Sequence, residues 1–294
     1  MPTDTGRQKT KQKTKQKTPL KDGNTMMDGK DIRIYVLAND EAYSEDFEAE
    51  HGLSLYIETP EHNILFDTGA SSVFARNAEH MGVDLKKADI AFISHGHYDH
   101  GGGMGKFLEI NPSAPVYISR YAFGDFYNAK GKFIGIDKNM RGSKRLKTVE
   151  KDTVIDGEIS VFPADGKYSV FPIDSAGLTE KRAEEYLPDR FLHEQYLLIN
   201  TGGRRILISG CSHRGILNIT ERFRPDIIIG GFHFMNQKIE NGPNAVLDDA
   251  ARRLSEYNTK YYTCHCTGKT QYEYLKTRMG EKLDYIAAGQ IITV

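Results

Sequence analysis

Short apolar runs alternate with polar and glycine-containing segments from Asp31 to the end of the chain. The run from Ile32 to Leu37 alternates in polarity and is rich in β-forming residues, which predicts a strand. Further strands are predicted at 53–57, 63–66 and 90–93. A short helix is predicted at 72–81, with a serine at its start and Gly82 after its end.

The second half of the chain repeats this pattern. Strands are predicted at 196–199, 205–208, 226–229, 260–263, 285–288 and 291–294. Helices are predicted at 216–223, at 244–257 and around Tyr272 and Leu275. The helix at 244–257 places five small or apolar residues on one face: Val246, Leu247, Ala250, Ala251 and Leu254. Strands outnumber helices and both halves share one theme, so we expect two sheets packed face to face with helices outside.

The first 30 residues differ from the rest of the chain. Residues 7–18 repeat a basic, polar unit with no apolar side chain to bury, so we expect a disordered tail over 1–30. A nucleic-acid-binding arm is the alternative interpretation. The remaining residues, 31–294, are predicted to form one domain.

Composition narrows the functional classes. The 294 residues are 39% hydrophobic and 27% charged, and the net charge of −1 gives no general attraction to nucleic acid or an anionic membrane. No apolar run approaches the roughly 20 residues that cross a bilayer, and the basic N-terminus lacks the apolar centre of a signal peptide. The three cysteines are too few and too clustered for a disulfide framework. We therefore expect a cytoplasmic, reduced protein.

The strongest chemical signal is the segment from His95 to His100, which directly follows an apolar strand. Imidazole nitrogens and carboxylate oxygens bind zinc and similar divalent ions. His95 and His97 can point to the same side, and Asp99 and His100 can serve a second ion nearby. Two ions about 3.5–4 Å apart can stabilise the attacking and the leaving oxygen of a displacement. The alternative is an exposed His-rich loop that binds nothing. Four potential ligands within six residues, directly after an apolar strand, argue against it.

The pattern His-x-His-x-Asp-His resembles the signature of the metallo-β-lactamase superfamily. The resemblance spans about residues 31–294. It implies an α+β fold, a four-layer αβ/βα sandwich with the metals at one edge. Asp67, in Phe66-Asp-Thr-Gly69, matches an early aspartate that supports the metal loop by hydrogen bonding. It could also simply begin a glycine turn.

Later motifs resemble one branch of this superfamily. They are Gly96 and Tyr98 within the metal loop, Glu194-Gln195, and the segments 210–215, 230–233 and 264–268. The branch is named for 7,8-dihydropterin-6-methyl-4-(β-D-ribofuranosyl)aminobenzene 5′-phosphate synthase, and many members carry only the label of metal-dependent hydrolase. The name implies displacement of pyrophosphate from a dihydropterin methyl diphosphate by an arylamine, in methanopterin-type cofactor synthesis. Paired metals suit that reaction, because they stabilise the leaving anion.

The second half of the metal site departs from the common superfamily pattern. Many members have a bridging aspartate after the strand that corresponds to 205–209, whereas this chain has Cys211 followed by His213. We predict His213 as a ligand, and Cys211 is either a thiolate ligand or a small packing residue. The resemblance implies that His265 is the last ligand. The spacing of Cys264 and Cys266 does not fit a closed zinc site, so both are predicted to pack.

Three further residues carry open roles. His193 lies in the region of the superfamily's third motif but in a predicted surface turn, so we predict that it is not a ligand. His233 could be a ligand, a general acid, a substrate contact or a structural residue. Asp99 could orient the nucleophile in hydrolysis besides binding metal, so Asp99 and His233 are the candidate catalytic residues.

Two segments flank the predicted metal loop. Residues 101–105 are glycine-rich, but they lack the Lys-Ser/Thr of a P-loop and are predicted to form a turn into a helix. Residues 121–145 combine basic and aromatic side chains. They begin an insert of about 121–150 that is either a lid over the metals or a solvated surface segment.

These observations predict a dinuclear metal enzyme that acts on a phosphorylated or diphosphate-bearing small molecule. The favoured form is a dihydropterin-type transferase or a related hydrolase, with two divalent ions. Zn²⁺ is favoured, and Mn²⁺, Fe²⁺ or Ni²⁺ are compatible. The alternative is a phosphodiesterase or nuclease acting on nucleic acid. A non-catalytic binding module is the third class, against which the intact metal loop argues. The sequence leaves the oligomeric state open.

Overall fold

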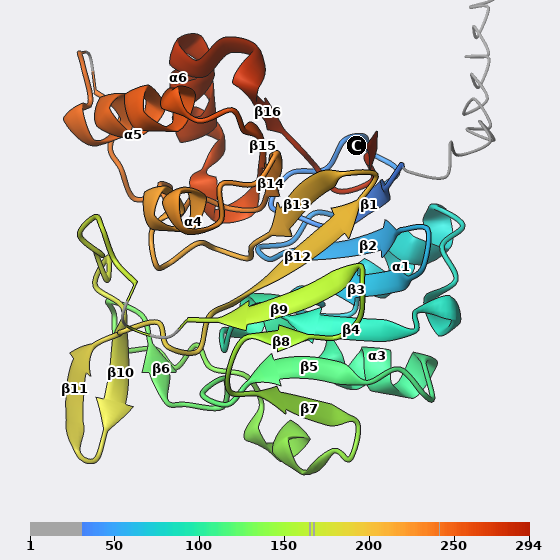
Figure 1. The fold of residues 1–294 in the computed structure, drawn as a ribbon. Helices are drawn as coiled ribbons and strands as arrows, with labels where there is room; N and C mark the ends of the chain where they lie inside the picture. Colours follow the sequence, from blue (N-terminus) through green and yellow to red (C-terminus); the bar gives the residue numbers. More distant parts are fainter. Residues whose placement is uncertain (1–30, 165, 167, 241) are drawn as a thin grey trace, which may run out of the picture.

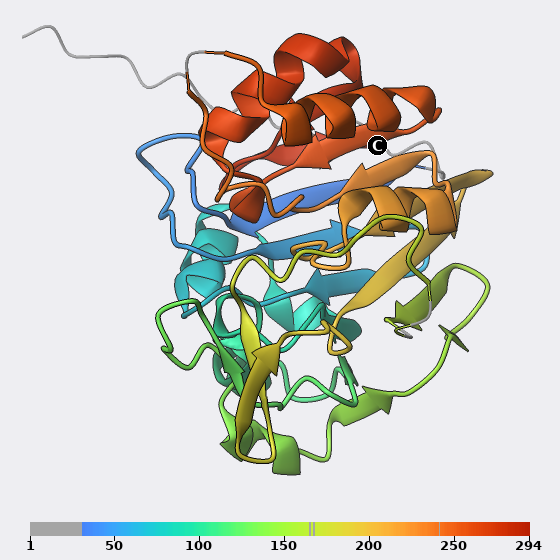
Figure 2. The same ribbon diagram turned by 90° about the vertical axis from the view of Figure 1, so that its left-hand side faces the viewer.

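Two seven-stranded sheets lie face to face in the computed structural model of the chain (Figure 1). The structure describes residues 31–164, 166, 168–240 and 242–294. The predicted disordered tail, 1–30, lies outside these residues. Helices cover the outer side of each sheet, as a view turned by 90° also shows (Figure 2). The predicted four-layer αβ/βα arrangement is therefore confirmed.

The first sheet has the strand order β17-β1-β2-β3-β4-β5-β7. Its strands are β1 (Arg33–Ala38), β2 (Ser54–Glu58), β3 (Asn63–Phe66), β4 (Ile90–Ile93), β5 (Val116–Ser119), β7 (Leu146–Val149) and β17 (Ile291–Thr293). Pairing is antiparallel from β17 to β3 and parallel from β3 to β7. The helices α1 (Val73–His80) and α3 (Met104–Ile110) belong to this half.

The second sheet has the order β16-β15-β14-β13-β12-β9-β8. Its strands are β8 (Thr153–Val154), β9 (Ile159–Pro163), β12 (Gln195–Thr201), β13 (Arg204–Ile208), β14 (Ile227–Ile229), β15 (Lys260–Thr263) and β16 (Leu283–Tyr285). Strands β13 to β16 run parallel, and the others pair antiparallel. The helices α4 (Ile216–Phe223), α5 (Ala245–Glu256) and α6 (Lys269–Met279) belong to this half.

A small third sheet stands at one side of the sandwich (Figure 1). It consists of β6 (Phe126–Tyr127), β10 (Thr179–Arg182) and β11 (Glu185–Pro188). The predicted insert therefore divides: β6 joins this small sheet, whereas β7 is the edge strand of the first sheet. Phe123 and Ile136, from the same segment, are buried in the core. Short helical turns complete the fold: α2 (Tyr98–Gly101), η1 (Leu85–Lys87), η2 (Lys138–Gly142), η3 (His265–Thr267) and η4 (Gly280–Lys282).

Both faces of each sheet are buried, because one faces the other sheet and one faces helices. In β1, Ile34 and Val36 belong to the core between the sheets, whereas Tyr35 and Leu37 pack in the outer cluster that includes Phe74 of α1. Each buried aliphatic side chain stabilises the fold by about 1.5–3 kcal/mol relative to its exposed state. The near-continuous apolar runs of the sequence follow from this double coverage.

One predicted core residue is placed differently. Val246 lies on the expected apolar face of α5, but its side chain is 51% exposed. The helix is buried instead through Leu247, Ala250, Ala251 and Leu254. Val246 belongs to the first turn, which borders a cavity rather than the sheet.

The topology brings chemically active residues to one edge of the sandwich. Strands β3 and β4 run parallel in the first sheet, as do β13, β14 and β15 in the second, and each ends at a motif singled out above. Parallel neighbours deliver their carboxyl ends to the same edge, where sites of α/β proteins commonly lie. Among the described residues, no helix is long and apolar enough to cross a membrane.

Candidate metal centre

The first donor group consists of His95, Cys211 and His213. One ligand atom from each lies within 4.8 Å of the others, and the three residues are buried. The Nε2 atoms of His95 and His213 are 3.3 Å apart. Burial lowers the pKa of both imidazoles well below the usual histidine value. Both rings are therefore neutral near pH 7 and have a nitrogen lone pair to offer a cation.

The second donor group consists of Asp99, His100, Cys211 and His265, whose ligand atoms also lie within 4.8 Å of one another. His100 Nε2 is 3.2 Å from Cys211 Sγ and 3.2 Å from His265 Nε2. His265 Nε2 is 3.2 Å from Asp99 Oδ2. Cys211 belongs to both groups, so it occupies the shared position between them.

His97 is the predicted ligand that neither donor group includes. Its ring centroid lies 4.7 Å from that of His95 and 4.9 Å from that of His213. Its Nε2 atom is buried and has no hydrogen-bond partner among the residues that the structure describes. Burial lowers the pKa of His97 to about 3, so the ring is neutral near pH 7, and its Nε2 lies 4.0 Å from Asp189 Oδ2. Leaving such an atom unsatisfied costs about 1–3 kcal/mol, which a bound cation would offset.

The donor set fits a divalent metal ion. Imidazole, carboxylate and thiol are the ligands that zinc and neighbouring metals take in proteins. Against the effect of burial, the neighbouring His100 and His265 hold the pKa of Asp99 well below its usual value. Burial raises the pKa of the Cys211 thiol, so the metal-free site contains the neutral thiol. A cation placed here would favour the thiolate.

Hydrogen bonds direct the ligand atoms of the metal loop. Asp67 Oδ2 accepts from His100 Nδ1 at 2.6 Å and from Ser94 Oγ at 2.7 Å. Its Oδ1 accepts from the Ser94 backbone N–H at 2.6 Å. Ser94 Oγ lies 2.8 Å from His95 Nδ1 and can accept its proton. The imidazoles of His95 and His100 are thereby held with their Nε2 atoms facing the donor groups. Asp67 thus forms hydrogen bonds to the metal loop, as the resemblance implied.

Asp40 and His51 join the centre, although sequence reasoning did not single them out. Asp40 contacts His265 Nδ1 at 2.5 Å and His51 Nδ1 at 2.9 Å, and His51 Nε2 lies 3.5 Å from Asp99. Although burial opposes it, these two imidazoles hold the pKa of Asp40 well below its usual value. The available signal was that Asn39-Asp40 directly follows a predicted strand, like the other motifs.

His193 is buried, so the prediction that it lies in a surface turn is wrong. The side chain is 1% exposed because its ring packs on Phe126, with centroids 4.0 Å apart. Its Nδ1 accepts from the Gly96 N–H at 3.0 Å, and its Nε2 lies 3.1 Å from Asp189 Oδ2. Both ring nitrogens therefore have partners within the protein, and ligand atoms of His193, His97 and Asp189 also lie within 4.8 Å of one another. The non-ligand role of His193 stays a prediction.

The Glu194-Gln195 motif connects, by hydrogen bonds, the segments of both sheets that lie beside the donor groups. The Glu194 carboxylate accepts from the backbone N–H of His213 and Arg214 at 2.7 and 3.0 Å, which holds the loop after β13. Gln195 Nε2 donates to the carbonyls of Ile93 and Tyr117, which lie in the first sheet. The motif thus fixes the two sheets relative to each other beside the donor groups.

His233 follows β14 and lies beside the first donor group. Its ring centroid is 4.3 Å from that of His213, and its backbone φ is +56°. Burial lowers its pKa to about 4, so the ring is neutral near pH 7. The preceding Gly230 has φ +149°, and a Cβ atom there would lie 2.1 Å from the Ser209 carbonyl oxygen. Only glycine fits this close approach.

Cys264 belongs to the core between the sheets, as predicted, whereas the buried Cys266 lies next to the centre, with its Sγ 3.5 Å from the Cys211 carbonyl oxygen. The glycine-rich stretch after His100 is a tight turn: a Cβ atom on Gly102 or Gly103 would lie within 2.4 Å of a backbone oxygen. The turn leads into α3, as predicted.

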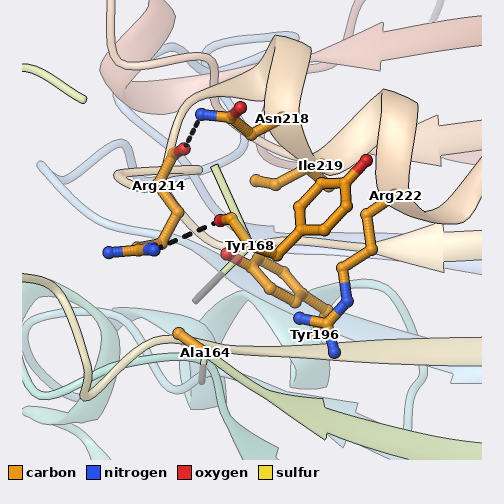
Figure 3. Close-up of a pocket in the computed structure, with 7 residues that line it drawn as sticks. All are labelled: Ala164, Tyr168, Tyr196, Arg214, Asn218, Ile219 and Arg222. Atoms are coloured by element: carbon orange, nitrogen blue, oxygen red, sulfur yellow. Dashed lines mark hydrogen bonds between the residues drawn. The ribbon is translucent and has the colours of Figure 1, made fainter. Parts of the chain in front are cut away.

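A cleft of about 180 Å³ opens over the donor groups. Its lining includes His97, Asp99, Cys211, His213, His233 and His265, together with Asn128 and Ile134 of the predicted insert. A separate pocket beside Arg214 has a volume of only about 10 Å³ (Figure 3). That is room for about one water molecule, so it is no substrate site.

Comparisons with known proteins agree with this geometry. A family model described as the metallo-beta-lactamase superfamily matches residues 48–261. An uncharacterised protein of Methanocaldococcus jannaschii is 30% identical over 80% of this chain and 90% of its own length. The 7,8-dihydropterin-6-methyl-4-(β-D-ribofuranosyl)-aminobenzene-5′-phosphate synthase of the same organism is 28% identical over 89% of this chain and 96% of its own.

Solved structures extend the match to the fold. A metal-dependent hydrolase of the β-lactamase superfamily superposes with a TM-score of 0.73 at 30% identity, covering 90% of this chain and 99% of that one. Zinc-bound PqqB from Methylobacterium extorquens superposes with a TM-score of 0.54 at 11% identity, covering 88% and 99%, which supports the fold alone. Because the family model matches well over half of the chain, this chain belongs to the metallo-β-lactamase superfamily.

Proposed function

We propose that the chain is an enzyme that holds two divalent cations and acts on small molecules carrying phosphate or diphosphate. The observation that carries the proposal is the pair of donor groups that share Cys211. His95 and His213, with His97 beside them, would hold one cation. Asp99, His100 and His265 would hold the other, with Cys211 between them. When bound, the cations would stabilise the negative charge that develops on a departing phosphate or diphosphate.

Residues around the donor groups would orient the ligand atoms and balance the positive charge of the cations. The carboxylates of Asp67 and Asp40 accept hydrogen bonds from the Nδ1 atoms of His100 and His265, which keeps the Nε2 atoms directed at the donor groups. The neutral His233 lies where it could contact the reacting part of a substrate in the cleft. Zinc is the favoured ion because imidazole and thiol ligands are combined, and Mn²⁺, Fe²⁺ and Ni²⁺ remain compatible with the set.

The favoured reaction is a dihydropterin-type transfer. The named relative, at 28% identity over most of the chain, supports this choice. In that reaction the bond between the pterin methylene carbon and the diphosphate oxygen breaks, and a bond from that carbon to the arylamine nitrogen forms. Pyrophosphate leaves and the amine loses a proton. In the related hydrolase, water replaces the amine.

The test is pyrophosphate release from 7,8-dihydropterin-6-methyl diphosphate, measured with and without a ribofuranosylaminobenzene phosphate. We expect release by the zinc-loaded protein and none by its His95→Ala variant at the same zinc concentration. Release that requires the amine supports the transferase, and release without it supports the hydrolase. A generic phosphodiester and a structured RNA are run in parallel. Cleavage of RNA with no release from the diphosphate would overturn the proposal in favour of a nuclease.

A further inference from the structure

A second cavity, of about 900 Å³, adjoins the metal cleft. We call it the side chamber. It shares His213, His233 and Asn236 with the cleft, so the two spaces meet at the edge of the first donor group. Small-molecule sites commonly have volumes of about 300–1,000 Å³. The chamber is therefore large enough for the body of a substrate whose reacting end lies in the cleft.

The walls of the side chamber are largely apolar. Phe232 and Phe234 follow β14, Ile216 and Leu217 begin α4, Phe171 comes from the segment after β9, and Val246 comes from α5. Val246 is 51% exposed although the sequence pattern places it on the apolar face of its helix. This exposure is explained if the first turn of α5 lines the chamber instead of packing in the core. Contiguous exposed apolar surface of this kind commonly marks a ligand groove.

Specific contacts hold one chamber wall in place. Asn218 of α4 is 2% exposed, and its Oδ1 accepts from the backbone N–H of Val170 and Phe171, each at 2.8 Å. Its Nδ2 donates to the Phe171 carbonyl at 3.0 Å and to the Arg214 carbonyl at 2.8 Å, the latter drawn in Figure 3. The Arg253 guanidinium lies 5.0 Å from the centre of the Phe171 ring. The wall is thus a built surface rather than a gap left by a loose loop.

The charge of the chamber limits what it can hold. Its described lining residues include the carboxylates of Asp174 and Asp249 but neither lysine nor arginine. Asp249 is paired with Arg252 and Arg253, whereas Asp174 Oδ1 accepts only from the Ala176 N–H in the described contacts. A phosphate group in the chamber would be repelled by these carboxylates, and the described lining residues offer no lysine or arginine to pair with it. An uncharged ring could instead donate its N–H groups to the carboxylate oxygens.

We propose that the side chamber binds the uncharged, planar nitrogen-heterocyclic body of the substrate, while its phosphate or diphosphate lies at the donor groups. This inference rests on the proposed function and adds where the substrate lies. The phenylalanine side chains offer ring faces for packing. Asp174 and the amide groups of Asn236 and Gln237 offer hydrogen bonds to ring nitrogens.

The test uses 6-hydroxymethylpterin, which has the heterocycle but no phosphate, and the 294-residue chain with and without zinc. Pterin fluorescence reports binding. Val246→Phe fills the chamber with a ring. Val154→Phe is the matched control, because Val154 in β8 is 74% exposed and does not line the chamber.

We expect Val246→Phe to weaken pterin binding by about tenfold or more, because the added ring occupies the ligand's space, and Val154→Phe to bind like the wild type. The zinc content of both variants should equal that of the wild type. Val246→Ala leaves the chamber open and should retain pterin binding. This control distinguishes filling of the chamber from any other effect of replacing Val246.

Two outcomes would overturn the inference. One is wild-type pterin binding by Val246→Phe, and the other is no binding by the wild type in either metal state. Failure of the proposed function gives a different result: pterin binds in a Val246-dependent way, yet the zinc-loaded protein releases no pyrophosphate. Conversely, equal pyrophosphate release at equal KM by the wild type and Val246→Phe refutes the chamber and leaves the function standing.

Discussion

Cys211 is the residue on which the geometry of the metal centre depends most. Its Sγ lies 3.2 Å from His100 Nε2, and it belongs to both donor groups. A shared thiolate would place one negative charge next to two cations, which no other residue of the two groups does. A thiolate here would be a softer ligand than the aspartate that the superfamily pattern places at this position.

Replacing Cys211 should therefore affect both cations at once. We expect Cys211→Ala to bind less than half of the wild-type zinc, as measured by mass spectrometry of the dialysed protein. Cys264→Ala is the control, because that thiol is buried in the core between the sheets and belongs to neither group. Wild-type zinc content in Cys211→Ala would show that Cys211 only packs.

His193 acts on the metal loop through the backbone of Gly96, which separates His95 from His97. His193→Ala removes the acceptor of the Gly96 N–H, so we expect metal affinity to fall about 10–100-fold while the number of bound ions at saturation stays unchanged. Competition with a fluorescent zinc chelator measures the affinity.

Two variants complete the His193 test. His193→Gln retains a polar side chain in place of the ring and should recover part of the affinity. His80→Gln, at the exposed end of α1, should have none of these effects. A lost equivalent of zinc in His193→Ala at saturation would identify His193 as a ligand, contrary to the prediction.

At the scale of the elements, the strand-end turns control where the site residues point. Gly230→Ala places a Cβ atom 2.1 Å from the Ser209 carbonyl oxygen, at a φ of +149°. We expect it to destabilise the protein by about 1–3 kcal/mol in urea unfolding, because either the turn after β14 or the end of β13 must shift. Gly157→Ala is the control, since nothing lies within 4 Å of its added Cβ. Equal stability of the two variants would contradict this close packing.

The turn between β2 and β3 is connected to the second half of the sandwich by His62. Its Nε2 lies 2.7 Å from Asp156 Oδ2, and its Nδ1 lies 3.3 Å from Asp89 Oδ1. Partial burial would lower the pKa of His62, but the two carboxylates outweigh it and raise that pKa above the usual value. The charged imidazole is therefore favoured in the folded protein.

The sign of the pH dependence follows from this shift. A raised folded-state pKa contributes stability that is complete below the unfolded histidine value of about 6.5 and is lost as the pH rises through the folded value. We expect the wild type to exceed His62→Gln by up to about 1 kcal/mol near pH 6, and by less at pH 9, in urea unfolding. A difference that grows with pH would refute the assignment.

At the scale of the whole molecule, the two sheets supply different members of the donor groups. His95, Asp99 and His100 follow β4 of the first sheet, whereas Cys211, His213 and His265 follow β13 and β15 of the second. Cations bound between them would connect the halves of the sandwich, and they can bind the folded state only after both halves have come together.

Metal removal should therefore lower thermal stability. At a free zinc concentration about 100-fold above Kd, binding adds about 2.7 kcal/mol, which corresponds to a Tm increase of about 5–10 °C for a domain of this size. Differential scanning calorimetry of chelator-treated and zinc-loaded protein measures the shift. His95→Ala should show a smaller increase, and an identical Tm with and without zinc would contradict the bridging arrangement.

The sequence by itself determined most of the elements and the centre of the site. Strands such as β1 and β4 follow from apolar runs rich in β-branched residues, which reflect local periodicity. The segment 95–100 could be interpreted as a metal loop because its donors are neighbours in the chain. His213 was predicted from its place after a strand, whereas Asp67 and His265 were implied by the superfamily resemblance. The structure brings all three to the same edge.

Only the tertiary structure decided which distant residues meet. Asp40 reaches His265 across 225 positions of sequence, and His193 is buried by Phe126 rather than exposed in a turn. Val246 borders a cavity although its helical pattern predicts a core position. The physical reason is common to all three. Periodicity reports which face of an element a residue occupies, whereas its partners depend on which strand ends the sheet topology brings together.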